Sequence, residues 1–143
     1  MKKLFFPLAL LLLAACGQKG QNAQGSQEDK PEGPLAQIEF PDGIDHNFGN
    51  YYEKVTKTYD FLVHNPGKVP LVINQVETFC SCTQANYPSN PILEGETDTI
   101  HVSFDGNGFV EGVWTKQIRV HANIEGGTKD LWIRGAYYDY KGQ

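Results

Sequence analysis

Short segments in which apolar and polar residues alternate are the feature that most constrains the fold. Residues 58–64 place Tyr59, Phe61 and Val63 on one face of an extended chain. Because successive side chains of a strand point to opposite faces, this period of two predicts a half-buried β-strand. Similar patterns occur at residues 99–104, 117–122 and 130–134, and further strand candidates lie at 71–76, 37–40 and 46–48. No segment shows the 3.6-residue period of a long amphipathic helix, so we expect an all-β fold.

Turn-forming residues separate these segments. Examples are Pro-Asp-Gly at residues 41–43, Asn-Pro-Gly at 65–67 and Gly-Gly at 126–127. Glycine reaches φ values closed to other residues and proline fixes its own φ, so such sequences are typical of turns. Short strands spaced by turns indicate an antiparallel sandwich or barrel, here of about seven strands.

The N-terminal residues are typical of a bacterial lipoprotein signal. A basic pair at 2–3 precedes a ten-residue apolar stretch at 4–13, which is shorter than the roughly 18 residues that span a bilayer. Leu-Ala-Ala-Cys at 13–16 then resembles the lipobox, whose cysteine receives a diacylglycerol group. We expect a signal peptide at 1–15 and a lipid anchor on Cys16 that holds the protein to a membrane of the bacterial cell envelope, facing the periplasm. The alternative is an ordinary signal peptide that ends near a cysteine.

A tether is predicted between the anchor and one folded domain. Residues 16–35 are rich in Gly, Gln, Ser and Pro, the composition of a flexible spacer that reaches on the order of 25 Å. The folded domain is therefore expected at residues 36–143. A net charge of −5 argues against a nucleic-acid partner, which would require a basic surface.

An ordered set of short sequences carries a family resemblance. It comprises Asn-Phe-Gly at 47–49, Tyr-Asp-Phe at 59–61, Pro-Leu-Val-Ile at 70–73, Phe-Cys-Ser-Cys-Thr at 79–83 and Leu-Trp-Ile-Arg-Gly at 131–135. As a set, these sequences resemble the DUF1573 family. The resemblance implies an immunoglobulin-like antiparallel β-sandwich, and it implies little about function because the family is one of unknown function. The family usually has Gly where this chain has Ser81, so we expect a more extended or slightly strained turn there.

Cys80 and Cys82 form the candidate site. Two residues of extended chain span about 6.6 Å, near the upper end of the roughly 4.4–6.8 Å between the Cα atoms of a disulfide, so a bond requires a bend and carries strain. A strained disulfide would suit redox exchange, and two close thiolates would suit a soft metal such as Cu(I) or Zn(II). A structural disulfide or a small buried pair is the third interpretation. Glu77 would raise the pKa of a nearby thiol and lower its reactivity, which favours the structural interpretation.

Other polar and aromatic residues give weaker signals. His64, His101 and His121 alternate onto the face of their strands that points away from the core. His46 is expected on the surface. The aromatic residues within 137–140 suit either core packing of a last strand or an exposed patch for a partner or a sugar.

The sequence contains no acid–base pair, cofactor loop or complete metal-ligand set that we recognise. We therefore expect no enzyme and no cofactor, but a binding or assembly module whose exposed edge strands pair with an extended segment of a partner protein. The alternative is a thiol-based redox or Cu(I)-binding protein that uses Cys80 and Cys82. A third hypothesis is a structural spacer that binds no ligand.

Overall fold

The computed structural model describes residues 33–107 and 111–139. The predicted signal peptide, the lipidation site Cys16 and most of the tether lie outside these ranges. Within them, no helix is long and apolar enough to cross a membrane.

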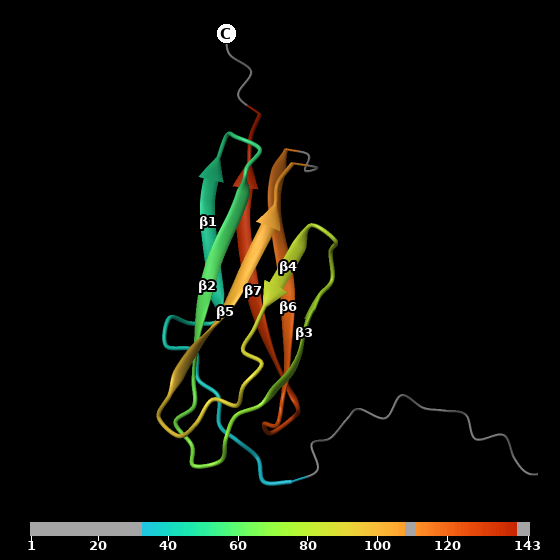
Figure 1. Ribbon diagram of the computed structural model, residues 1–143. Coiled ribbons are helices and arrows are strands. Elements are labelled where there is room, and N and C mark those ends of the chain that lie inside the picture. Colours follow the sequence, from blue (N-terminus) through green and yellow to red (C-terminus); the bar gives the residue numbers. More distant parts are fainter. Residues whose placement is uncertain (1–32, 108–110, 140–143) are drawn as a thin grey trace, which may run out of the picture.

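Seven strands form two sheets that pack face to face (Figure 1). One sheet contains, in order, β1 (Asp45–Tyr51), β7 (Thr128–Tyr137), β6 (Gly112–Ala122) and β3 (Ile73–Thr78). The other contains β2 (Thr56–His64), β5 (Thr97–Asp105) and β4 (Thr83–Asn86). The predicted all-β sandwich of about seven strands is confirmed.

The strand order is immunoglobulin-like, with a changed position for the first strand. The sets β2-β5-β4 and β7-β6-β3 correspond to the two sheets of that fold, in which the first strand normally joins the second. Here β1 pairs in parallel with β7, whereas the other ladders are antiparallel. The segment before β1 does contact the second strand, because Glu39 and His64 exchange two backbone hydrogen bonds of 2.9 and 2.8 Å. The entering chain therefore contacts both sheets.

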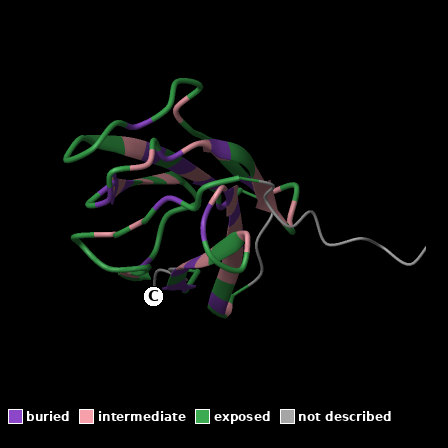
Figure 2. Cartoon of the chain, turned by 90° about the horizontal axis from the view of Figure 1, so that it is seen from below, coloured by how far each residue is buried: buried purple, intermediate pink, exposed green. Residues whose placement is uncertain are grey.

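The core lies between the sheets and consists mainly of the side chains that point inward from strands with alternating apolar and polar residues. Buried and exposed stretches alternate along the strands in Figure 2. Near one end, the Trp114 ring stacks on Phe104 with centroids 4.0 Å apart. Gly135 lies against the same indole, and a Cβ there would stand 2.9 Å from Trp114 Cζ2. A side chain at this position would therefore overlap the core.

The predicted turn at residues 65–67 is held by a fully buried asparagine. Asn65 Nδ2 donates to the carbonyls of Val69 and Ile92, each at 2.9 Å. Its Oδ1 accepts from the Gly67 N–H at 3.0 Å. Since each polar atom of this side chain has a partner, its burial leaves no group unsatisfied.

The strand predictions differ from the structure in three places. Residues 37–40 form an isolated bridge at Glu39 and no strand. The strand expected at 71–76 begins at Ile73, and Leu71 forms only a bridge. Strand β4 was not predicted, since four residues are too few for alternation to stand out.

Candidate functional site

The chain passes from the four-stranded to the three-stranded sheet through a turn that contains the two cysteines. A disulfide joins Cys80 and Cys82, whose Cα atoms lie 5.2 Å apart. The Cys80 carbonyl accepts a hydrogen bond from the Thr83 N–H at 3.0 Å, which closes a β-turn. The turn is thus tight rather than extended. Ser81 also avoids the left-handed region, because no non-glycine residue in the described ranges has a positive φ.

Hydrogen bonds hold this turn independently of the disulfide. The Cys82 carbonyl accepts from the Asp105 N–H on β5 at 2.8 Å, and Thr78 Oγ1 donates to the Thr83 carbonyl at 2.9 Å. On the chain-entropy model, a cross-link that closes so short a loop contributes about 1.6 kcal/mol, against about 3 kcal/mol for a loop of roughly 15 residues. The disulfide is therefore a minor contributor to the stability of the domain.

The two sulfur atoms have different neighbours. The Cys82 N–H donates a hydrogen bond to Cys80 Sγ at 3.2 Å. Cys82 Sγ has a more distant neighbour, the Thr83 hydroxyl oxygen at 3.7 Å. A backbone N–H directed at sulfur favours the thiolate when the disulfide opens, so the surroundings favour Cys80 as the leaving group.

A small polar cavity of about 220 Å³ adjoins one of the two cysteines. The residues that line it carry hydroxyl, amide, carboxylate or sulfur groups: Thr56, Ser81, Cys82, Gln84, Ser103 and Asp105. Ser81 is exposed, and both cysteines are half-buried. Of the two cysteines, Cys82 is the one that lines this cavity.

The histidines on the outer faces of the strands pair with other groups. His101 Nδ1 bonds to Asp60 across the β2–β5 ladder, and His121 Nε2 lies 3.0 Å from Glu77 Oε2. His64 Nδ1 lies 3.1 Å from a hydroxyl oxygen at the start of β5. The Glu77 carboxylate is thus paired with a histidine side chain. In the described ranges, no group of three or more His, Cys, Asp or Glu side chains is placed to hold a metal ion.

An ion pair lies on the outer face of the four-stranded sheet, near the disulfide turn. Arg119 Nε donates to Asp130 Oδ1 at 2.9 Å, and Gln117 Nε2 donates to Asp130 Oδ2 at 2.7 Å. The hydrogen bond from Arg119 lowers the pKa of Asp130, although burial opposes it. The Arg119 guanidinium also lies 5.6 Å from the ring centroid of Phe79, an exposed residue that directly precedes the cysteine pair.

His46 is not the surface residue that the sequence suggested. It lies half-buried on β1, and its ring stacks on Tyr59 of β2 with centroids 3.6 Å apart. The same imidazole and the Phe48 ring lie nearly perpendicular, with centroids 4.6 Å apart. Burial lowers the pKa of His46, and the charge of Asp45 partly offsets this effect.

Strand β2 is an edge strand whose hydrogen bonds show which backbone groups face outward. His64 bonds to Glu39 on the side away from β5. Since the residues of an antiparallel strand alternate between its two sides, the N–H and C=O groups of Leu62, Asp60 and Thr58 face the same open side. Among the backbone–backbone hydrogen bonds outside the strand ladders in residues 33–107 and 111–139, none involves these groups. The alternation of apolar and polar residues could not reveal this open edge, because the edge is defined by the order and register of the strands.

The edge of β4, on the other flank in Figure 1, is partly covered. The Cys82 carbonyl faces β5, because it accepts a hydrogen bond from the Asp105 N–H. The backbone N–H and C=O of the next residue, Thr83, therefore face the open side of β4. There, the Thr83 N–H and C=O are already bonded to Cys80 and Thr78. The cysteine turn thus closes the start of this edge, so β2 offers the longer open edge of the three-stranded sheet.

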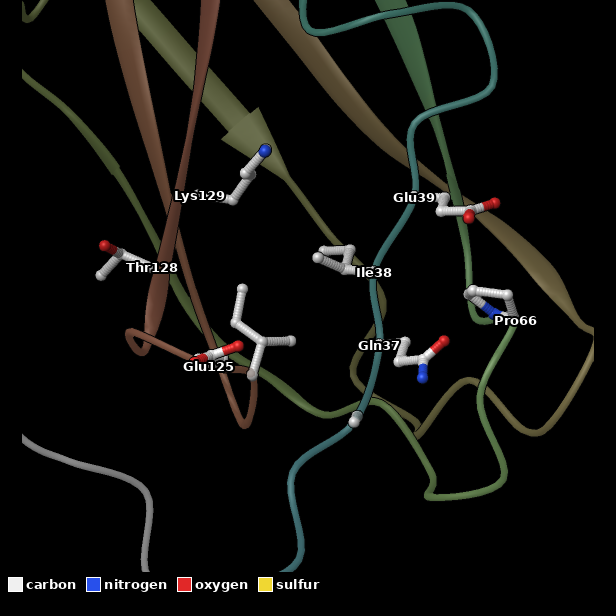
Figure 3. Close-up of a pocket in the computed structure, with 9 residues that line it drawn as sticks. Gln37, Ile38, Glu39, Pro66, Glu125, Thr128 and Lys129 are labelled. Atoms are coloured by element: carbon white, nitrogen blue, oxygen red, sulfur yellow. The ribbon is translucent and has the colours of Figure 1, made fainter.

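A larger hollow of about 420 Å³ lies beside the segment that enters the domain. In Figure 3, Ile38 lies on one side of this segment, with Thr128 and Lys129 beyond it, and Gln37 and Glu39 lie on the other side. The lining contains no cysteine or histidine. Its chemistry is that of a mixed polar surface.

Comparisons with known proteins identify the fold more clearly than the function. A family model described as a protein of unknown function, DUF1573, matches residues 39–137. No curated protein matches the sequence.

Solved structures show the same sandwich at low sequence identity. A protein of unknown function from Porphyromonas gingivalis W83 matches with a TM-score of 0.62 and 15% identity, over 71% of this chain and 47% of the other. The ASH/PapD-like domain 7 of human CEP192 matches with 0.60 and 9%, over 85% and 99%. The YadV chaperone matches with 0.52 and 13%, over 76% and 54%. The chain thus spans about half the length of the first of these proteins, and the likeness shows the fold alone.

Proposed function

The chain belongs to the DUF1573 family, whose function is unknown, and we propose that it is a lipid-anchored cell-envelope protein with a non-catalytic binding module. The observation that carries this proposal is the open edge of β2. Thr58, Asp60 and Leu62 each offer an N–H and a C=O to an incoming strand. An extended segment of a partner protein would pair with these groups as an additional strand. The likeness in fold to the YadV chaperone supports a protein-binding role.

The side chains around the open edge would restrict which segments bind. Lys57 points inward near one end of β2, with its amine 4.6 Å from the ring centroid of Tyr51. An inward-pointing charge on an edge strand hinders indiscriminate pairing between sheets. On the outer face, the exposed Asp60 would favour a basic or polar residue opposite it.

The predicted anchor would set where this module works. A lipid on Cys16 and the tether that follows would hold the domain within on the order of 25 Å of the membrane surface. Tethering raises the effective concentration of the domain towards partners in the same compartment. A weak strand addition would then suffice for binding.

A proline substitution in the open edge tests the proposal. Thr58→Pro removes an N–H that points away from β5, so the ladder with β5 keeps its bonds. Thr58→Val is the matched control, because it changes the side chain and keeps the N–H. A photo-crosslinking residue at Thr56, an exposed position on the same edge, reports binding in the full-length, membrane-anchored protein in cells.

We expect one discrete crosslinked product in the wild-type background and with Thr58→Val, and its loss with Thr58→Pro. A product that persists with Thr58→Pro contradicts pairing through the β2 backbone. A product obtained only when the crosslinker stands at Thr115, on the outer face of the other sheet, would instead locate binding there.

A further inference from the structure

We propose that the Cys80–Cys82 disulfide is a thiol–disulfide exchange site that accepts two electrons from a protein dithiol. This inference is independent of binding at β2. It rests on three observations: the turn has hydrogen bonds that do not involve the disulfide, one cysteine lines a cavity, and the sulfur of the other has the closer hydrogen-bond donor.

The turn has the bonds to keep its shape when the disulfide opens. The Thr83 N–H bonds to the Cys80 carbonyl, the Asp105 N–H bonds to the Cys82 carbonyl, and Thr78 bonds to the Thr83 carbonyl. None of these bonds involves sulfur. The oxidised and reduced forms would therefore share one fold, as an exchange site requires.

The surroundings distinguish the attacked sulfur from the departing one. Cys82 lines the 220 Å³ cavity and is only partly buried, so an incoming thiolate would approach this cysteine from the cavity. The Cys82 N–H, 3.2 Å from Cys80 Sγ, stabilises the negative charge that develops on Cys80. The hydroxyl and amide groups of Thr56, Gln84 and Ser103 suit the polar backbone of a protein that carries the thiol.

The exchange proceeds in two balanced steps. The donor thiolate attacks Cys82 Sγ, a donor–Cys82 disulfide forms, the Cys80–Cys82 bond breaks, and Cys80 leaves as a thiolate. The second donor thiol loses its proton and attacks the donor sulfur of this mixed disulfide, which releases the Cys82 thiolate. The two protons lost by the donor neutralise Cys80 and Cys82. The donor is oxidised to a disulfide and the cysteine pair is reduced.

Equilibration with a dithiol protein tests the proposal. The full chain contains three cysteines, so Cys16→Ser leaves only the pair to report. The protein is incubated with mixtures of reduced and oxidised thioredoxin, free thiols are trapped by alkylation, and intact mass gives the reduced fraction. We expect half-reduction at a reduced-to-oxidised thioredoxin ratio below about ten, with unchanged far-UV circular dichroism. Half-reduction only above that ratio, or unfolding on reduction, overturns the proposal.

A pair of variants isolates the backbone donor. Cys82→Ser leaves Cys80 as a free thiol and keeps the N–H that faces it, whereas Cys82→Pro removes this N–H. We expect iodoacetamide to alkylate Cys80 about three to ten times more slowly in Cys82→Pro than in Cys82→Ser near neutral pH. Circular dichroism confirms that each variant is folded. Equal rates in two folded variants contradict the role of Cys80 as the stabilised leaving group.

Discussion

Trp114 on β6 donates a hydrogen bond from Nε1 to the hydroxyl of Tyr51 at the end of β1, at 2.8 Å in the buried core. These residues lie on strands separated by β7 in the sheet, and β1 is the strand with the parallel pairing. The bond therefore ties the repositioned first strand to the core. Burial raises the pKa of Tyr51, although the bond from Trp114 opposes this effect.

Tyr51→Phe removes the acceptor of this bond and leaves the packing of the ring in place. We expect a loss of about 1–2 kcal/mol in the free energy of unfolding, because a buried donor is deprived of its acceptor. Urea denaturation followed by tryptophan fluorescence measures the change. Tyr52→Phe is the control, since Tyr52 is 56% exposed and its substitution should have little effect. Equal stability of wild type and Tyr51→Phe would contradict the structural role of the bond.

Gly135→Ala tests the close packing against the same indole. The added Cβ would stand 2.9 Å from Trp114 Cζ2, a rigid ring atom in the core. We expect a loss of about 1–3 kcal/mol in unfolding free energy through overpacking, measured as a lower urea midpoint. Thr115→Ala, at an exposed position of the neighbouring strand, should leave the midpoint nearly unchanged. A Gly135→Ala protein as stable as the wild type would show that the Trp114 indole shifts easily to make room for the added methyl group.

His46 makes stability depend on pH. Its pKa is lowered in the folded state from 6.5, so the unfolded chain binds the proton more tightly. Its contribution to stability is complete above pH 6.5 and declines as the pH falls from there towards the folded-state pKa. His46→Phe keeps an aromatic ring against Tyr59 and removes the titration. We expect thermal melts of this variant to show a smaller drop in Tm between about pH 7 and pH 5 than the wild type; an unchanged drop refutes the assignment.

Asp130→Asn tests the ion pair beside the cysteine turn. Because Arg119 lowers the pKa of Asp130 below 3.8, the pair stabilises the fold above that pH, and this contribution is lost as the pH falls through the folded-state pKa. We expect a small destabilisation at neutral pH, since partly exposed ion pairs are weak. The difference from wild type should vanish in strong acid. A difference that persists there would indicate lost packing rather than lost charge.

Residue patterns predicted much of the sandwich but little of its edges. Strands β2 and β5 are long enough for alternation to define both their position and their inward face, as at Phe61 and Ile100. Parallel pairing of β1 depends on contacts between distant parts of the chain, and no local pattern encodes it. His46 was misplaced for the same reason, because its partner Tyr59 lies on a strand of the other sheet.

The candidate site was likewise predictable from the sequence only in part. The proximity of Cys80 and Cys82 follows from their spacing, so the pair could be found in the sequence alone. The donor to Cys80 Sγ is a backbone N–H, which side-chain identity cannot reveal. The open groups of Thr58 and Leu62 likewise depend on the β2–β5 register.

Amide hydrogen exchange on the full-length protein, resolved by NMR, examines the open edge on which the proposed function depends. We predict fast exchange at Thr58, Asp60 and Leu62, and slow exchange at Tyr59 and Phe61, whose N–H groups face β5. This alternation would establish that β2 is available to a partner strand. Equally slow exchange at all five residues would show that the edge is already covered, and would contradict binding by strand addition at β2.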